Sequence, residues 1–147
     1  MVGRPANGAV WAMRVLLDTN ILLDVLLNRA PWVTDSSAIW GACDDGRIVG
    51  YVPASAMTDI FYIARRAVDL PTARIAVGLC LSAFEICPID RQTLEQAATL
   101  PGSDFEDNVQ LVSASIAGLD AIVTRNPSDF MAAALPILTP AALLAQL

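Results

Sequence analysis

A short apolar run near the amino end most constrains the fold of this 147-residue chain. The segment Val15-Leu16-Leu17 has no polar side chain on either face, which is typical of a parallel-sheet strand covered by helices on both sides. This first strand is expected at residues 14–18, and further strands at residues 47–52, 85–87, 120–124 and around 138. Helical segments separate most of them. The alternation predicts an α/β fold, a three-layer α/β/α sandwich on a mostly parallel five-stranded sheet.

Capping residues mark two of the expected helix starts. Ser55 is expected to cap a helix that runs to about residue 69. Ser103, with Glu106 three residues later, has the spacing of a capping box and is expected to open a helix that stops at Gly118. The other helices are expected at residues 21–28, 32–45, 71–83, 90–99 and from 140 onward.

Composition favours a single domain. With 55% apolar and 16% charged residues the chain can bury a sizeable core, and residues 13–147 are expected to form one domain. Residues 1–12 are expected to be an unstructured leader, contributed by upstream codons or a vector, because Met13 directly precedes the first strand. No apolar stretch reaches the roughly 18 residues of a membrane span. A cytoplasmic location without membrane contact is expected.

Side-chain chemistry excludes several kinds of site. The chain has no histidine, and its three cysteines lack CxxC spacing, so buried thiols are expected rather than a zinc site. Fifteen acidic residues outnumber nine basic ones, and the net charge of −6 argues against a general nucleic-acid coat protein. The charge does not exclude an enzyme that approaches nucleic acid through a bound cation. The high apolar content also indicates a surface made for another protein chain.

Asp18 is the first candidate functional residue. It ends the first strand at the carboxyl end, which is the edge where ligands bind in open α/β sheets. The alternative is that Asp18, Thr19 or Asn20 only caps the following helix. Asp120 starts a strand at the opposite edge and is expected to be structural.

Three more acids are candidates from helices. Asp59 shares the apolar stripe of its helix, where an unpaired carboxylate is costly. The alternative to a shared cation is an ion pair with Arg66 or Arg125. Asp104 and Asp107 are three residues apart on one helix face, and favourable placement near the helix dipole is an alternative that is strongest for Asp104. Asp107 is expected to lie deeper in the helix.

Polar residues after the fourth expected strand complete the set. Asn126 and Asp129 follow that strand at the functional edge, although ordinary turn chemistry around Pro127 also explains them. The remaining acids, including Asp24, fit exposed helix faces or caps.

The candidate acids suit divalent-metal chemistry on phosphodiesters. Carboxylate oxygens are the ligands that Mg²⁺ and Mn²⁺ prefer, and a metal can generate the nucleophile where histidine and lysine are lacking. Arginines near the site can hold flanking phosphates, although each serves equally well as a surface or ion-pair residue. These are Arg29, Arg65, Arg66 and Arg125. The absence of lysine excludes aspartyl-phosphate phosphatases and receiver domains, and no P-loop is present.

The sequence resembles PIN domains in four ordered motifs between residue 13 and the carboxyl terminus. The motifs are residues 15–24 (VLLDTNILLD), 58–63 (TDIFYI), 104–110 (DFEDNVQ), and 122–130 with 138–140. The resemblance implies a strand order of 3-2-1-4-5 and a metal-dependent ribonuclease. Many small bacterial members are the toxin of a VapBC-type toxin–antitoxin pair.

The resemblance also implies the roles of individual residues. Mg²⁺ or Mn²⁺ would be held by Asp18, Asp59 and Asp107, with help from Asp104 and from either Asn126 or Asp129. It implies a homodimer and an antitoxin whose carboxyl-terminal segment lies in an apolar groove. Two positions depart from the family pattern: Asp59 stands where Glu is frequent, and Asn126 where an acid is expected.

Our hypothesis from the sequence is an endoribonuclease of PIN type, and a toxin. Hydrolysis would leave a 5′-phosphate and a 3′-hydroxyl, as the family implies. The runner-up is a degenerate PIN-like module that binds RNA or a protein without cleaving.

Overall fold

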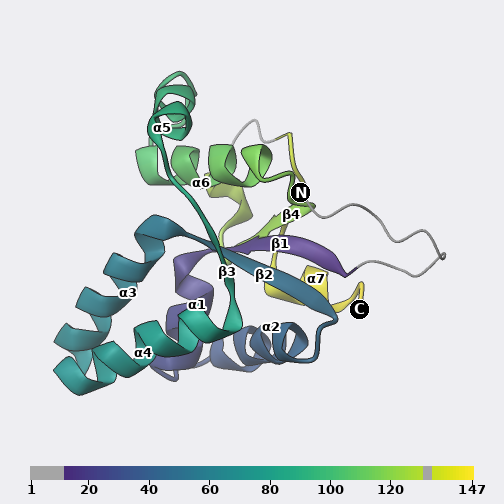
Figure 1. Ribbon diagram of the computed structural model, residues 1–147. Coiled ribbons are helices and arrows are strands. Elements are labelled where there is room, and N and C mark those ends of the chain that lie inside the picture. The colour runs from purple at the N-terminus through teal and green to yellow at the C-terminus, as the bar shows by residue number, and fades with distance from the viewer. Residues whose placement is uncertain (1–11, 131–133) are drawn as a thin grey trace.

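A five-stranded parallel sheet forms the middle layer of the molecule (Figure 1). The computed structural model describes residues 12–130 and 134–147, so nearly all of the expected leader at residues 1–12 lies outside the described residues. The strand order is β3-β2-β1-β4-β5 and every pairing is parallel, which confirms the predicted fold class. The strands are β1 (Met13–Leu17), β2 (Ile48–Pro53), β3 (Glu85–Cys87), β4 (Ala121–Val123) and β5 (Ile137–Leu138).

Helices cover both faces of this sheet. In Figure 1, α1 to α4 and α7 lie below the sheet, and α5 and α6 lie above it. The five helices of the lower layer are α1 (Thr19–Leu26), α2 (Val33–Asp44), α3 (Ala54–Ala67), α4 (Leu70–Ala83) and α7 (Pro140–Leu144). The upper layer holds α5 (Arg91–Ala98) and α6 (Phe105–Ile116), and a 3₁₀ turn, η1 (Pro127–Asp129), follows β4.

The central strand β1 is buried from both sides, as its apolar run predicts. Val15 and Leu17 belong to the core beneath the sheet, whereas Leu16 belongs to the core on the side of α6. All three side chains are fully buried, and each such burial stabilises the fold by about 1.5–3 kcal/mol. Both cores therefore fix β1, and with it the residue that follows its carboxyl end.

Two helix starts differ from the sequence expectation. Ser55 does not cap α3, which begins at Ala54 directly after Pro53 without a side-chain cap. The cap of α6 is Asp104 rather than Ser103, because the Asp104 carboxylate accepts a hydrogen bond of 3.1 Å from the Asp107 backbone N–H. The expected capping box was therefore wrong by one residue. Glu106 has no capping role, and Asp107 lies in the first turn rather than deeper in the helix.

The expectation of buried free thiols is confirmed in its main part. Cys80 and Cys87 are buried, Cys43 is half-buried, and none of the three forms a disulfide. Burial raises the thiol pKa to about 12 for Cys43 and Cys80 and to about 11 for Cys87. No helix within residues 12–130 and 134–147 has the length and apolar character that spanning a bilayer requires.

Candidate metal centre

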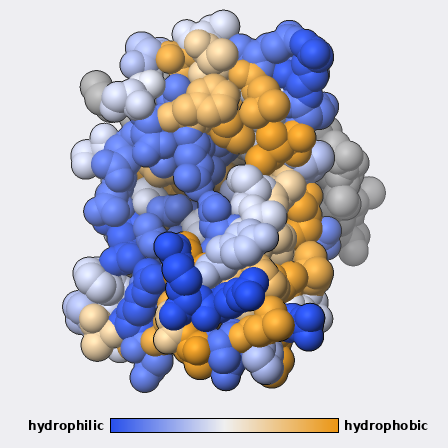
Figure 2. Space-filling model, turned by 90° about the vertical axis from the view of Figure 1, so that its left-hand side faces the viewer, coloured by the Kyte–Doolittle hydropathy of each residue, from blue (hydrophilic) through white to orange (hydrophobic). Residues whose placement is uncertain are grey.

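An acidic hollow lies at the carboxyl edge of the sheet, between α3 and the start of α6. Its volume is about 430 Å³. Figure 2 looks at the side of the molecule that carries α3 and shows hydrophilic residues gathered in the middle of this face. The structure places around this one hollow the predicted residues Asp18, Thr19, Asn20, Asp59, Asp104, Asp107, Asn126 and Asp129.

Asp18 is held in place by the central strands. Its backbone N–H donates to the Val123 carbonyl (3.0 Å), and the Thr124 hydroxyl donates to the Asp18 carboxylate (3.0 Å). Although Asp18 precedes α1, its side chain makes no capping hydrogen bond. Burial raises the pKa of Asp18, and hydrogen bonds from Thr124 and Gln110 offset part of this rise. Asp18 is thus the N-cap residue of α1 by position, but its desolvated carboxylate lines the hollow and does not cap the helix.

Asp59 reaches the hollow from α3 and is not neutralised by arginine. No arginine nitrogen of the described residues lies within 4.0 Å of its carboxylate, so the predicted alternative of an ion pair with Arg66 or Arg125 is wrong. Its neighbour around the hollow is instead Glu106, and the charge of Asp59 adds to the rise in the Glu106 pKa that burial causes. Two adjacent acids create a shared need for a proton or a cation.

Glu106 is a member of the hollow that the sequence analysis missed. Burial and then the negative charge of Asp59 raise the pKa of Glu106 to about 7. Burial, followed by the charges of Asp104 and Asp18, raises the pKa of Asp107 to about 6. The sequence holds a second possible capping pair, Asp104 with Asp107, one residue after Ser103 and Glu106. Because the helix uses this second pair, the Glu106 side chain has no capping role.

Two polar side chains add uncharged oxygen atoms to this site. The side-chain oxygens of Thr19 and Gln110 are buried and have no hydrogen-bond partner among the described residues. Gln110, also missed from the sequence, lies one turn after Asp107 on the same helix face. The backbone N–H of Asn126 donates to Thr124 (3.2 Å), which holds the loop after β4 against Asp18.

The donor set fits a hard divalent cation. It consists of carboxylate, amide and hydroxyl oxygens, which Mg²⁺ and Mn²⁺ prefer, and the raised carboxyl pKa values show charge that a cation would offset. In the part of the chain that the structure describes, no three Asp, Glu, Cys or His side chains already form a metal site. Binding would therefore require side chains around the hollow to turn toward the ion.

Asp24, expected on an exposed face, is instead fully buried, and that expectation was wrong. Its carboxylate lies 3.2 Å from Arg125 Nε and 3.9 Å from Arg29 Nη1, and it accepts a 3.2 Å hydrogen bond from the Ser36 hydroxyl. The Arg125 guanidinium also lies 4.0 Å over the Trp32 ring. Arg29 and Arg125 thus have a structural partner, whereas Arg65 and Arg66 are exposed at the end of α3.

Comparison with known proteins agrees with this geometry. The sequence profile described as the PIN domain matches residues 14–128. A search of curated proteins gave no significant match. Among solved structures, a toxin–antitoxin complex from Klebsiella pneumoniae is 22% identical and aligns over 86% of this chain and 97% of its own, with a TM-score of 0.64.

Two further structures share the fold at lower identity. DNA-bound VapBC from Salmonella typhimurium is 16% identical, with a TM-score of 0.66, and covers 87% of this chain and 98% of its own. VapC20 from Mycobacterium tuberculosis, a toxin that cleaves the sarcin–ricin loop, is 12% identical, with a TM-score of 0.61. The alignment covers 74% of this chain and 86% of VapC20.

Proposed function

The chain belongs to the PIN domain family, and from this premise we propose that it is a divalent-metal-dependent endoribonuclease. One observation carries the proposal: acids that follow β1, lie on α3 and lie at the start of α6, far apart in sequence, line a single hollow at the functional edge of the sheet. A structural cluster would pair these acids with arginine, as the chain does for Asp24. These acids face one another instead.

The residues of the hollow have distinct proposed roles. Asp18, Asp59 and Asp107 would hold Mg²⁺ or Mn²⁺, with Asp104 beside them and Asn126 or Asp129 as an auxiliary. A bound divalent ion lowers the pKa of its water and neutralises charge on the phosphodiester. Thr124 holds the Asp18 carboxylate in one orientation through its 3.0 Å hydrogen bond. Gln110, which lies near enough to Asp18 to lower its pKa, would help to keep that orientation when an ion binds.

We further propose that the protein is a cytoplasmic toxin controlled by a small antitoxin protein. The Klebsiella, Salmonella and Rickettsia structures with this fold are toxin–antitoxin complexes or carry the VapBC name. Exposed apolar side chains on α4, Ile75 and Leu79, lie one turn apart and offer an apolar surface for such a partner. A homodimer is also proposed, and light scattering on the purified chain tests it.

RNA cleavage with added Mg²⁺ or Mn²⁺ tests the enzymatic proposal. The wild-type protein is expected to produce fragments with 5′-phosphate ends, EDTA is expected to stop cleavage, and Asp18→Asn is expected to lower the rate at least about 100-fold. Asp120→Asn is the matched control, because Asp120 lies at the opposite edge of the sheet and accepts a hydrogen bond from the Arg14 N–H. Equal rates for wild type and Asp18→Asn would contradict the proposal.

The second candidate is a PIN module that binds without cleaving. Asn126, where the resemblance expects an acid, favours it, since a neutral side chain weakens cation binding. Calorimetric metal titration separates the two candidates. Metal binding that Asp18→Asn abolishes, without cleavage of any RNA tested, would support the binding module.

A further inference from the structure

The arginines of this chain divide into two groups. Five described arginines have polar partners for their guanidinium groups. Four form an ion pair with an acid at 3.2–3.9 Å, and one donates hydrogen bonds to Tyr51 and to backbone carbonyls. These are Arg29, Arg47, Arg91, Arg125 and Arg14. Arg65, Arg66 and Arg74 have no ion pair with any described residue. Arg14 also lacks an acidic partner but its guanidinium donates to Tyr51 and Ala117, so Arg65, Arg66 and Arg74 are the described guanidinium groups without a polar contact in a chain of net charge −6.

Two of these unpaired arginines lie beside the acidic hollow on the same helix. Asp59 lines the acidic hollow, and a second hollow of about 530 Å³ is lined by Tyr62, Arg65 and Arg66. Because residues three and four apart share a helix face, this second hollow continues from Asp59 toward the end of α3. With a rise of about 1.5 Å per residue, the arginines begin about 9 Å from Asp59 along the helix axis. Figure 2 shows strongly hydrophilic residues below the middle of this face.

Tyr62 adds an exposed aromatic ring to the arginines. Its side chain is 58% exposed, and its ring meets that of Phe61 edge to face at 5.1 Å. Phe61 packs against the core, so the tyrosine ring has a fixed support while much of its surface stays open to solvent. An open aromatic ring next to guanidinium groups is the combination that binds single-stranded nucleic acid: bases stack on the ring and arginine holds phosphate.

We propose that Tyr62, Arg65 and Arg66 form a binding surface for the RNA strand that flanks the cleaved phosphate. This inference rests on the proposed ribonuclease function. The acids around the hollow repel the phosphate backbone, and the arginine surface supplies compensating positive charge on one side of that hollow. The strand would run along α3, with one base on Tyr62 and the adjoining phosphates on the two guanidinium groups. Because these contacts go to phosphates and to a ring face, the surface binds without reading base sequence.

RNA binding in a variant that does not cleave tests this surface. The probe is a fluorescein-labelled, mixed-sequence single-stranded RNA of about 20 nucleotides, bound by full-length Asp18→Asn protein and followed by fluorescence anisotropy. Adding Arg65→Gln and Arg66→Gln together is expected to weaken binding at least about tenfold. The slope of log K against log salt concentration should fall by about 1.4, since each phosphate contact in a single strand contributes about 0.7.

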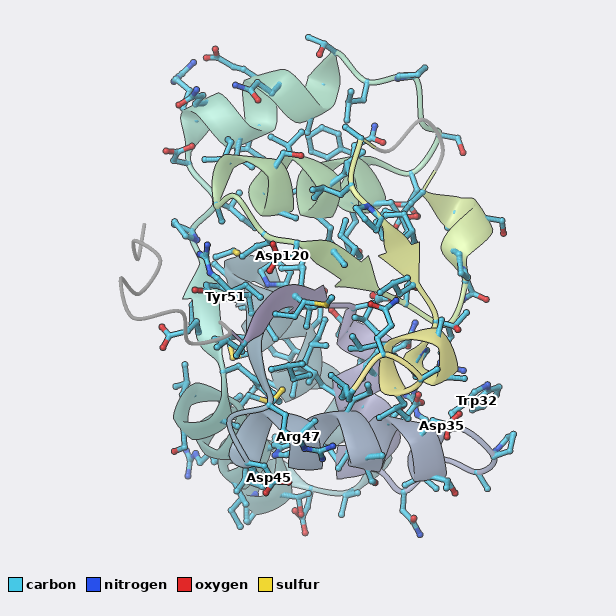
Figure 3. The ribbon with its side chains drawn as sticks, turned by 90° about the vertical axis from the view of Figure 1, so that its right-hand side faces the viewer. Trp32, Asp35, Asp45, Arg47, Tyr51 and Asp120 are labelled. Carbon is cyan, nitrogen blue, oxygen red and sulfur yellow. The ribbon has the colours of Figure 1, made fainter. Side chains whose placement is uncertain are left out.

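Matched variants separate the surface from a general charge effect. Arg47→Gln removes one positive charge just before β2, where Arg47 pairs with exposed Asp45 (Figure 3), and is the control for Arg65→Gln or Arg66→Gln made singly; it is expected to leave RNA binding unchanged. Tyr62→Phe keeps the ring and should bind like the parent, whereas Tyr62→Ala should weaken binding several-fold. In the cleaving protein, the arginine variants should raise KM for the 20-nucleotide RNA.

The outcomes distinguish this surface from the nuclease proposal itself. Metal-dependent cleavage with equal RNA affinity in parent and double-arginine variant would overturn the surface and leave the nuclease in place. Weaker RNA binding by the double variant of a protein that cleaves nothing would support the surface and overturn the nuclease. Unchanged RNA affinity combined with lost binding of a polyglutamate peptide would also overturn the surface, because it would then serve an acidic protein chain.

Discussion

Asp24 and the acids of the hollow lie near one another at the carboxyl edge of the sheet, yet Asp24 is paired with arginine and the acids of the hollow are not. Asp24 is completely buried, but two arginines and a serine hydroxyl surround it. The acids of the hollow are less buried and face other acids; partial burial, and then these neighbouring charges, raise the pKa of Glu106 and Asp107. The comparison teaches that burial of a carboxylate alone does not identify a functional site. What distinguishes the acids of the hollow is that no arginine of the described residues forms an ion pair with them.

The largest loss of folding stability is expected from a mutation of Asp24, the acid that is paired with arginine. Asp24→Ala leaves Arg125 and Arg29 without their acid, and breaking a buried pair in this way costs about 3–5 kcal/mol. Urea unfolding measures the loss. Asp35→Ala, on the exposed start of α2, is the control and should cost less than about 1 kcal/mol. A small effect at Asp24 would remove one side of the comparison.

Cation binding should produce the next largest effect, and only at the hollow. At a free Mn²⁺ concentration of 100 times Kd, the free energy of unfolding is expected to rise by about 2.7 kcal/mol. Thermal unfolding with and without Mn²⁺ checks this. Asp107→Asn should abolish the rise, whereas Asp120→Asn should retain it, because Asp120 binds the Arg14 N–H at the far edge (Figure 3). An equal rise in both variants would place the ion elsewhere.

The metal-free protein should lose stability as pH rises. The pKa values of Glu106 and Asp107 are raised in the folded protein to about 7 and about 6, so the folded state holds protons that the unfolded state has released. The contribution of these two acids to stability is therefore fully present below about pH 4 and is lost between about pH 4 and 7. Chemical unfolding at pH 5 and pH 7.5 tests the direction. The Glu106→Gln, Asp107→Asn double variant should flatten the dependence, and an unchanged slope would contradict the assignment to these acids.

The smallest change in stability is expected for Glu106, where one substitution should affect stability and metal binding in opposite directions. Glu106→Gln removes a negative charge beside Asp59 and is expected to stabilise the metal-free protein by about 0.5 kcal/mol, as removal of a like-charge neighbour does. The same change should weaken Mn²⁺ binding in a calorimetric titration. Destabilisation by Glu106→Gln would show that Glu106 has a structural partner after all, as Asp24 does.

The sequence predicted the sheet better than the surroundings of individual acids. The apolar run before Asp18 predicted a strand buried on both faces, and the structure confirms it with Leu16 on one side and Val15 and Leu17 on the other. The predicted strands and their parallel pairing are likewise confirmed. These features depend on local periodicity, which the sequence displays directly.

The errors arose where the partner of a side chain is distant in sequence. Asp24 was expected to be exposed, although an acid inside the apolar run of residues 21–27 signals burial; its partner Arg125 is about a hundred residues away. Glu106 was missed because two capping patterns overlap by one residue, and only the backbone position of α6 decides between them. The roles of the residues that line the hollow stay predictions until the variants above are measured.

The two-sided burial of β1 also limits how this protein can vary. A one-residue insertion in β1 would exchange the layers into which Val15, Leu16 and Leu17 point. It would also move the Asp18 carboxylate away from the hollow. Homologous chains should therefore differ from this one by substitutions in β1 and never by length. Insertions and deletions should accumulate instead in surface loops whose residues belong neither to the cores nor to the hollow.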